Sequence, residues 1–116
     1  MALHTGGCHC GAVRYEVDGD LSSVIECNCS HCAKKGFLLA FTPRGAFALK
    51  SGQDQLSEYT FNTGKIRHFF CKACGVQSFA HGVAPDGSEM AAINVRCVDG
   101  LDISALTVTP VNGKDF

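Results

Sequence analysis

The sequence lacks several features that would assign it to a common functional class. It has no apolar run approaching the ~18 residues needed to cross a membrane. Its first seven residues have neither the basic nor the apolar region of a secretory signal. Its charge is balanced, with Lys+Arg 10 against Asp+Glu 11, so no basic excess points to nucleic acid. We therefore expect a cytoplasmic chain that binds neither membranes nor nucleic acid.

Common catalytic motifs are missing as well. The sequence contains no glycine-rich phosphate loop, no Ser-His-Asp arrangement and no paired-carboxylate motif. No segment has a convincing long helical period, and only a short helical turn is expected, beginning near Ser30. At 116 residues and 46% hydrophobic, the chain is nevertheless long and apolar enough to bury a core. We expect one domain over residues 1–116.

Short apolar or alternating segments separated by turn residues predict an all-β domain of antiparallel strands. The run Phe37–Thr42 is apolar at nearly every position, which predicts a buried strand. The tail Pro110–Phe116 is expected to be loosely held. The other strands are expected near residues 12–17, 24–25, 46–50, 56–61, 66–70, 76–80, 90–95 and 106–108, with hairpin-type turns at 18–19 and 62–65.

Cysteine is what the sequence has in quantity: eight residues, seven of them in three tight clusters. Disulfides are rare in a reducing compartment, and closely spaced cysteine pairs suit a metal ion better than one another. A disulfide framework is the alternative, and it would require a secreted protein. The clusters are Cys8-His9-Cys10, Cys27-Asn28-Cys29-Ser30-His31-Cys32 and Cys71-Lys72-Ala73-Cys74.

The first and last clusters can share one zinc ion. Cys8 and Cys10 are two residues apart, so both side chains point to the same side of an extended chain. Cys71, Cys74 and Gly75 form a zinc knuckle in which the glycine can take a positive φ. Four thiolates make a closed tetrahedral site, so we interpret these four cysteines as structural zinc ligands. Four unconnected buried cysteines are the alternative.

The middle cluster supplies three sulfurs, those of Cys27, Cys29 and Cys32, from only six residues. A fourth ligand must come from a distant side chain, water or a substrate. If Cys97 is that ligand, the site is closed and structural; if not, the zinc is open. An open zinc with three thiolates keeps a bound thiol ionised, which fits thiol alkylation or addition to a carbonyl. A disulfide between Cys29 and Cys32, as in a redox sensor, is a third possibility.

Other polar residues have weaker claims to a role. His31 could donate a hydrogen bond near the middle cluster or carry protons, and an exposed turn position is an equal alternative. His68 and His81 could line a pocket, although a solvated face is the expectation for each. Five cationic residues could bind substrate carboxylates, although each reads more simply as a surface charge: Lys34, Lys35, Lys65, Arg67 and Arg96.

The cysteine motifs resemble those of the glutathione-dependent formaldehyde-activating family, which is related to centromere protein V-type domains. The resemblance implies a β-tent fold, a structural zinc on the residues matching Cys8, Cys10, Cys71 and Cys74, and a catalytic zinc on those matching Cys27, Cys29 and Cys32. The matching segments are 7–15, 27–32, 70–75 and 93–102.

The same resemblance implies a reaction. The family's named activity is a carbon–sulfur lyase reaction that forms S-(hydroxymethyl)glutathione from glutathione and formaldehyde. We therefore predict a zinc enzyme that acts on glutathione or a related thiol and a small aldehyde. Because fold and metal sites are shared more widely than substrates, a two-zinc binding module without catalysis is the alternative. The oligomeric state is left open, a homo-oligomer included.

Overall fold

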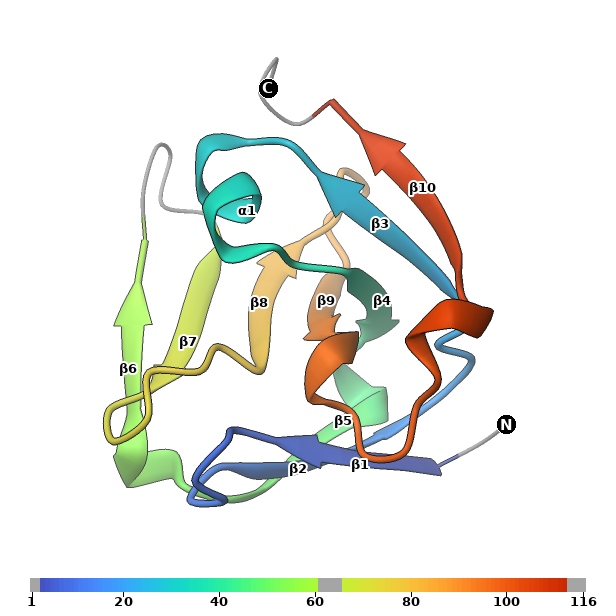
Figure 1. Cartoon of the computed structure of the whole chain (residues 1–116). Helices are drawn as coiled ribbons and strands as arrows, with labels where there is room; N and C mark the ends of the chain where they lie inside the picture. The colour runs from blue at the N-terminus through green and yellow to red at the C-terminus, as the bar shows by residue number, and fades with distance from the viewer. Residues whose placement is uncertain (1–2, 61–65, 113–116) are drawn as a thin grey trace.

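The computed structural model describes residues 3–60 and 66–112, which form short strands, one α-helix and four 3-10 turns (Figure 1). The strands are β1 (Leu3–Gly7), β2 (Arg14–Asp18), β3 (Ser23–Cys27), β4 (Leu39–Pro43), β5 (Phe47–Ser51), β6 (Leu56–Tyr59), β7 (Arg67–Cys71), β8 (Phe79–Val83), β9 (Glu89–Asn94) and β10 (Thr107–Val111). The helix is α1 (Ser30–Lys35), and the 3-10 turns are η1 (Arg44–Ala46), η2 (Gln53–Gln55), η3 (Val95–Cys97) and η4 (Ile103–Ala105).

The strands form two sheets. The smaller has the order β1-β2-β5, and the larger has the order β10-β3-β4-β9-β8-β7-β6. Figure 1 shows β3 and β10 on one side of the central strands β4, β9 and β8, with β6 and β7 on the other side. Helix α1 lies between these two arms: it packs on β3, and its His31 ring contacts the rings of Tyr59 in β6 and His68 in β7.

The prediction of an all-β domain with one short helical turn near Ser30 is confirmed, with three differences. The predicted turn at 18–19 does not close a hairpin, because β2 and β3 belong to different sheets. Strand β1 was not expected, because its sequence Leu-His-Thr-Gly-Gly has no apolar alternation. The tail was expected to be loose from Pro110, yet Pro110 and Val111 belong to β10, which pairs parallel with β3. Proline is tolerated there because β10 is at the sheet edge. The expected turn at 62–65 lies outside the described residues.

The core fills the space between the two sheets. The ring of Tyr15 in β2 lies 5.3 Å from that of Phe47 in β5 and 6.3 Å from that of Phe79 in β8. The rings of Phe47 and Phe79 are 4.7 Å apart, so aromatic side chains from both sheets meet directly. Val13 and Val17 are fully buried beside them. This core cluster also includes Cys8 and Cys71, so the apolar core and the first cysteine site adjoin each other.

The larger sheet is apolar on both faces, but only one face belongs to the core. In β9, Ala91 and Ile93 are fully buried, whereas the alternate residues Met90 and Ala92 line a cavity. The same alternation holds in β4, where Ala40 is buried and Phe41 is half-exposed in the cavity. The strand predicted to be buried at 37–42 is therefore buried on one face only, and the prediction is wrong for the other face, which borders the cavity. No helix in the described ranges has the length and apolarity to cross a bilayer.

Candidate metal centres

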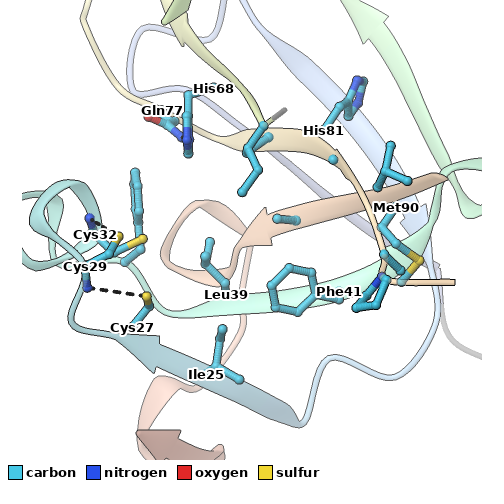
Figure 2. A pocket seen from close by; sticks show the side chains of 18 residues that line it. Ile25, Cys27, Cys29, Cys32, Leu39, Phe41, His68, Gln77, His81 and Met90 are labelled. Carbon is cyan, nitrogen blue, oxygen red and sulfur yellow. Dashed lines mark hydrogen bonds between the residues drawn. The ribbon is translucent and has the colours of Figure 1, made fainter. Parts of the chain in front are cut away.

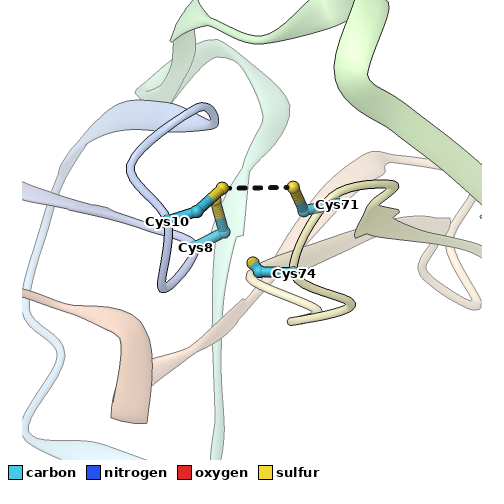
Figure 3. Close-up of side chains that lie close together, drawn as sticks. All are labelled: Cys8, Cys10, Cys71 and Cys74. Atoms are coloured by element: carbon cyan, nitrogen blue, oxygen red, sulfur yellow. Dashed lines mark hydrogen bonds between the residues drawn. The ribbon is translucent and has the colours of Figure 1, made fainter.

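The four sulfurs of the first and last clusters lie close together, near the end of β1 in the smaller sheet and the end of β7 in the larger sheet. Cys8 follows β1, Cys10 lies in the loop before β2, Cys71 ends β7 and Cys74 lies in the next turn. All four Sγ atoms lie within 4.8 Å of one another and point to a common centre (Figure 3). The Sγ atoms of Cys8 and Cys10 are 3.6 Å apart, and those of Cys10 and Cys71 are 3.7 Å apart.

These separations fit a zinc ion. A tetrahedron with Zn–S bonds of about 2.3 Å has sulfur–sulfur edges of about 3.8 Å. The sulfurs of Cys8, Cys10 and Cys71 already have nearly that spacing. The set is purely thiol, which is the ligand type that closed structural zinc sites use. Because its members are about 60 residues apart in sequence, an ion here would connect β1 to β7 across the fold.

Backbone N–H groups around this four-cysteine cluster stabilise the thiolate form of its side chains. The knuckle turn is closed by Gly75 N–H donating to the Cys71 carbonyl at 2.8 Å, and Gly75 has φ +79, as the sequence predicts. The N–H groups of Val76 and Cys10 lower the pKa of the Cys74 thiol to about 6. The N–H of Val13 donates to Cys8 Sγ at 3.3 Å. Such donors stabilise thiolate and orient it for a metal.

The middle cluster is built locally, at the junction of β3 and α1. Cys27 ends β3, Cys29 is the N-cap of α1 and Cys32 lies in its first turn. Their three Sγ atoms lie within 4.8 Å of one another. The N–H of Cys29 donates to Cys27 Sγ at 3.5 Å, and the N–H of Cys32 donates to Cys29 Sγ at 3.4 Å. The end of β3 and the start of α1 together therefore set the positions of all three sulfurs.

The charges in this cluster favour a bound cation. Burial opposes ionisation of Cys29, but the N–H of Cys32 lowers the pKa of its thiol. Burial raises the pKa of Cys32, and the nearby sulfurs of Cys29 and Cys27 raise it further. Three thiolates this close repel one another, and a divalent cation between them would remove that repulsion. The donor set, like the first one, fits zinc.

Cys97 does not join either cluster within the described residues. It ends η3, is partly buried, and donates to the carbonyl of Gln77 at a sulfur–oxygen distance of 3.8 Å. Burial raises the pKa of this thiol, and the thiols of Cys8 and Cys74 raise it further. These belong to the four-cysteine set, so the hypothesis that Cys97 completes the three-cysteine set has no support in the geometry.

A cavity of about 560 Å³ adjoins the three-cysteine cluster, on the sheet face opposite the core (Figure 2). Cys27, Cys29 and Cys32 line one end of it, beside His68 and Gln77. Apart from His81, the remaining wall is apolar and comes mainly from β3, β4, β8 and β9. A second cavity of about 360 Å³ also touches the cluster, next to Cys27 and Cys32. The three sulfurs are thus accessible to a small molecule.

The histidines near this cavity divide between the two faces of the sheet. His68 is buried, contrary to the expected solvated face, and its Nδ1 lies 3.1 Å from Gln77 Nε2. Because an amide NH₂ only donates, Nδ1 accepts and the ring proton is on Nε2. Burial lowers the pKa of His68 to about 4, with His31 and Lys35 adding to the effect. The ring is therefore neutral at pH 7.

His81 is the next residue on the same face of β8 as Phe79, and its ring packs against Phe47, Phe69 and Phe79. His81 also lines the cavity, so this residue lies between the cavity and the aromatic core (Figure 2). His31 is half-buried in α1, in ring contact with Phe37, and burial lowers its pKa. His31 is thus packed against the rings of Phe37, Tyr59 and His68 and is not an exposed turn residue.

The fold and its sites define a small, nearly all-β protein with two cysteine clusters that could each hold zinc. The chain belongs to the glutathione-dependent formaldehyde-activating enzyme family, whose sequence profile matches residues 3–110. Its structure is similar to the crystal structure of a Rhodobacter sphaeroides protein, with a TM-score of 0.78 and 27% sequence identity. That alignment covers 90% of this chain and 99% of the other.

Sequence reasoning missed two parts of the cavity: its apolar wall and the side chain of Gln77. Gln77 was not considered, although it lines the cavity and contacts His68. No spacing rule points to a single glutamine in a loop. The cavity wall did leave a signal in the sequence. A strand that is apolar at nearly every position has two apolar faces, and each needs an apolar environment. Leu39 and Phe41 are on the face that lines the cavity.

Proposed function

We propose that this chain is a zinc-dependent carbon–sulfur lyase that joins a small thiol to a small aldehyde such as formaldehyde and catalyses the reverse cleavage. Cys27, Cys29 and Cys32 would hold the catalytic zinc, and Cys8, Cys10, Cys71 and Cys74 would hold a structural one. The observation that carries the proposal is the grouping of three cysteine sulfurs, with no fourth cysteine among the described residues, at the end of a cavity large enough for a substrate.

A zinc ion bound by three thiolates would keep a substrate thiol ionised at neutral pH. In the addition, the sulfur lone pair forms a bond to the aldehyde carbon, and the carbon–oxygen π pair moves to oxygen. That oxygen takes up the proton that the thiol gave up, so the product is a hydroxymethyl thioether. The reverse reaction breaks the same carbon–sulfur bond and returns thiol and aldehyde.

The protein's own residues contribute position and a proton donor. The cysteines fix the sulfur end of the cavity through the start of α1. His68 is held by Gln77 with its proton on Nε2, so its neutral ring can donate to the oxygen as negative charge develops there. The apolar wall excludes water, which strengthens that hydrogen bond.

Cobalt substitution tests this proposal with a small neutral thiol, 2-mercaptoethanol. We expect millimolar thiol to change the visible absorption of the cobalt bound by the three-cysteine set, because a fourth sulfur joins it. With formaldehyde present, the zinc-loaded protein should exchange thiol and adduct faster than the uncatalysed reaction, as measured by NMR exchange spectroscopy. Unchanged spectra and an unchanged exchange rate for every thiol tried would refute the proposed function.

A further inference from the structure

The cavity beside the three-cysteine cluster has most of its polar side chains at one end. The three cysteines, His68 and Gln77 lie at that end, and the other polar lining residue, His81, packs its ring on the core aromatics (Figure 2). The opposite end is formed by apolar side chains, among them Leu39, Phe41 and Met90. A ligand that fits this arrangement has one sulfur-bearing end and an apolar body.

The described residues that line this cavity include no lysine, arginine, aspartate or glutamate. Those lining the smaller cavity include Glu26 but no cation. Lys65 was also predicted as a candidate for binding carboxylates, and it lies outside the described residues. Neither cavity therefore offers, in its described wall, a charged partner for a carboxylate.

The other cationic candidates are placed elsewhere. Arg67 forms a two-point contact with Glu58, with nitrogen–oxygen distances of 3.0 and 2.8 Å. Arg96 Nε donates to the Gly36 carbonyl at 3.2 Å. Lys34 and Lys35 are exposed in the last turn of α1 and line neither cavity. None of these four cations lines either cavity, although Lys35 is near enough to His68 to help lower its pKa.

Glutathione has two carboxylates and an ammonium group at neutral pH. Placing a carboxylate against an apolar wall removes its hydration and supplies no compensating charge. Placing an apolar group of a ligand against the same wall lowers the free energy of binding, because that group leaves water. The volume of about 560 Å³ lies within the range of about 300–1,000 Å³ that small-molecule sites occupy. The cavity volume therefore accommodates a ligand with a substantial apolar body. The absence of charged side chains from its described wall disfavours glutathione.

We propose that the thiol this cavity accepts is a neutral thiol with an apolar body, in preference to an anionic peptide thiol such as glutathione. This inference rests on the proposed function for its chemistry: the neutral thiol adds to the aldehyde carbon and its proton goes to the aldehyde oxygen. The selectivity itself rests on the cavity wall and is a property of binding.

Binding of 2-phenylethanethiol and glutathione to the cobalt-substituted protein tests the selectivity without turnover. We expect 2-phenylethanethiol to bind at least about tenfold more tightly, a difference of about 1.4 kcal/mol. Equal or tighter binding of glutathione, or binding of neither thiol, would overturn the inference. Exchange kinetics with formaldehyde then separate the two claims. Selective binding without catalysis defeats the proposed function alone, whereas catalysis that prefers glutathione defeats this inference alone.

A charge introduced in the wall provides a second test. Phe41 is half-exposed in the cavity, so Phe41→Lys can keep its ammonium group near water at the cavity mouth. We expect this variant to shift the affinity ratio toward glutathione by at least about fivefold. Leu3→Lys is the matched control, because Leu3 is an exposed apolar strand residue outside both cavities. An unchanged ratio in Phe41→Lys, or an equal shift in Leu3→Lys, would contradict the inference.

Discussion

Replacing Cys71 with serine is expected to remove one zinc per chain and most of the stability of the folded state. Cys71 is buried, and its sulfur lies 3.7 Å from that of Cys10. A structural zinc contributes about 10–16 kcal/mol of apparent binding free energy, comparable to the whole stability of a small domain. The measurements are metal content and thermal unfolding by circular dichroism. Chelation of the wild-type protein should reproduce the loss, which covers the case in which Cys71→Ser does not fold.

Cys97→Ser is the control for this variant. It also removes a partly buried thiol, but one that belongs to neither cluster, and a serine hydroxyl can still donate to the Gln77 carbonyl. We expect Cys97→Ser to keep both zinc ions. Full metal content in Cys71→Ser, or loss of one zinc in Cys97→Ser, would contradict the assignment of the four-cysteine set.

Cys29→Ser is expected to abolish thiol–aldehyde exchange while leaving the fold intact. Loss of residues that merely orient metal ligands lowers metal affinity or activity by about 10–100-fold, so loss of a ligand should lower it by at least about 100-fold. Serine is a good helix N-cap, and its Oγ can accept the Cys32 N–H as the Cys29 sulfur does. The start of α1 should therefore be preserved, and the unfolding temperature should change little.

The readouts for Cys29→Ser are zinc content, exchange rate and the circular dichroism spectrum. One zinc should remain, because the four-cysteine set is untouched. Ser30→Ala is the control, since Ser30 is an exposed neighbour in the same turn without a sulfur. It should keep both zinc ions and the full exchange rate. Exchange at the wild-type rate in Cys29→Ser would show that the reaction does not use this cluster.

The cysteine clusters were predictable because their spacing within the chain is short. A Cys-x-x-Cys turn and a helix start limit where sulfurs can point, so local geometry suffices to bring Cys27, Cys29 and Cys32 together. The joining of Cys8 and Cys71 depends instead on strands that meet only in the folded chain. Its prediction depended on the number of ligands that zinc requires rather than on any contact visible in the sequence.

What the sequence could not show was which surface each apolar residue faces. Phe41 and Ile93 are both apolar strand residues, yet Phe41 is half-exposed in the cavity and Ile93 is fully buried in the core. Their roles depend on the packing of the second sheet against one face only. The parallel pairing of β10 with β3 was hidden for a similar reason, because Pro110 argues against a strand unless its edge position is known.

Metal analysis combined with zinc-edge X-ray absorption tests the central claim most directly. The two clusters predict two zinc ions per chain and an average of about 3.5 sulfur ligands per zinc, because one set has four sulfurs and the other three. Adding 2-phenylethanethiol should raise that average to about 4 as a fourth sulfur joins the open site. A single zinc per chain, or an average of about 4 sulfurs before any thiol is added, would contradict an open three-cysteine zinc site.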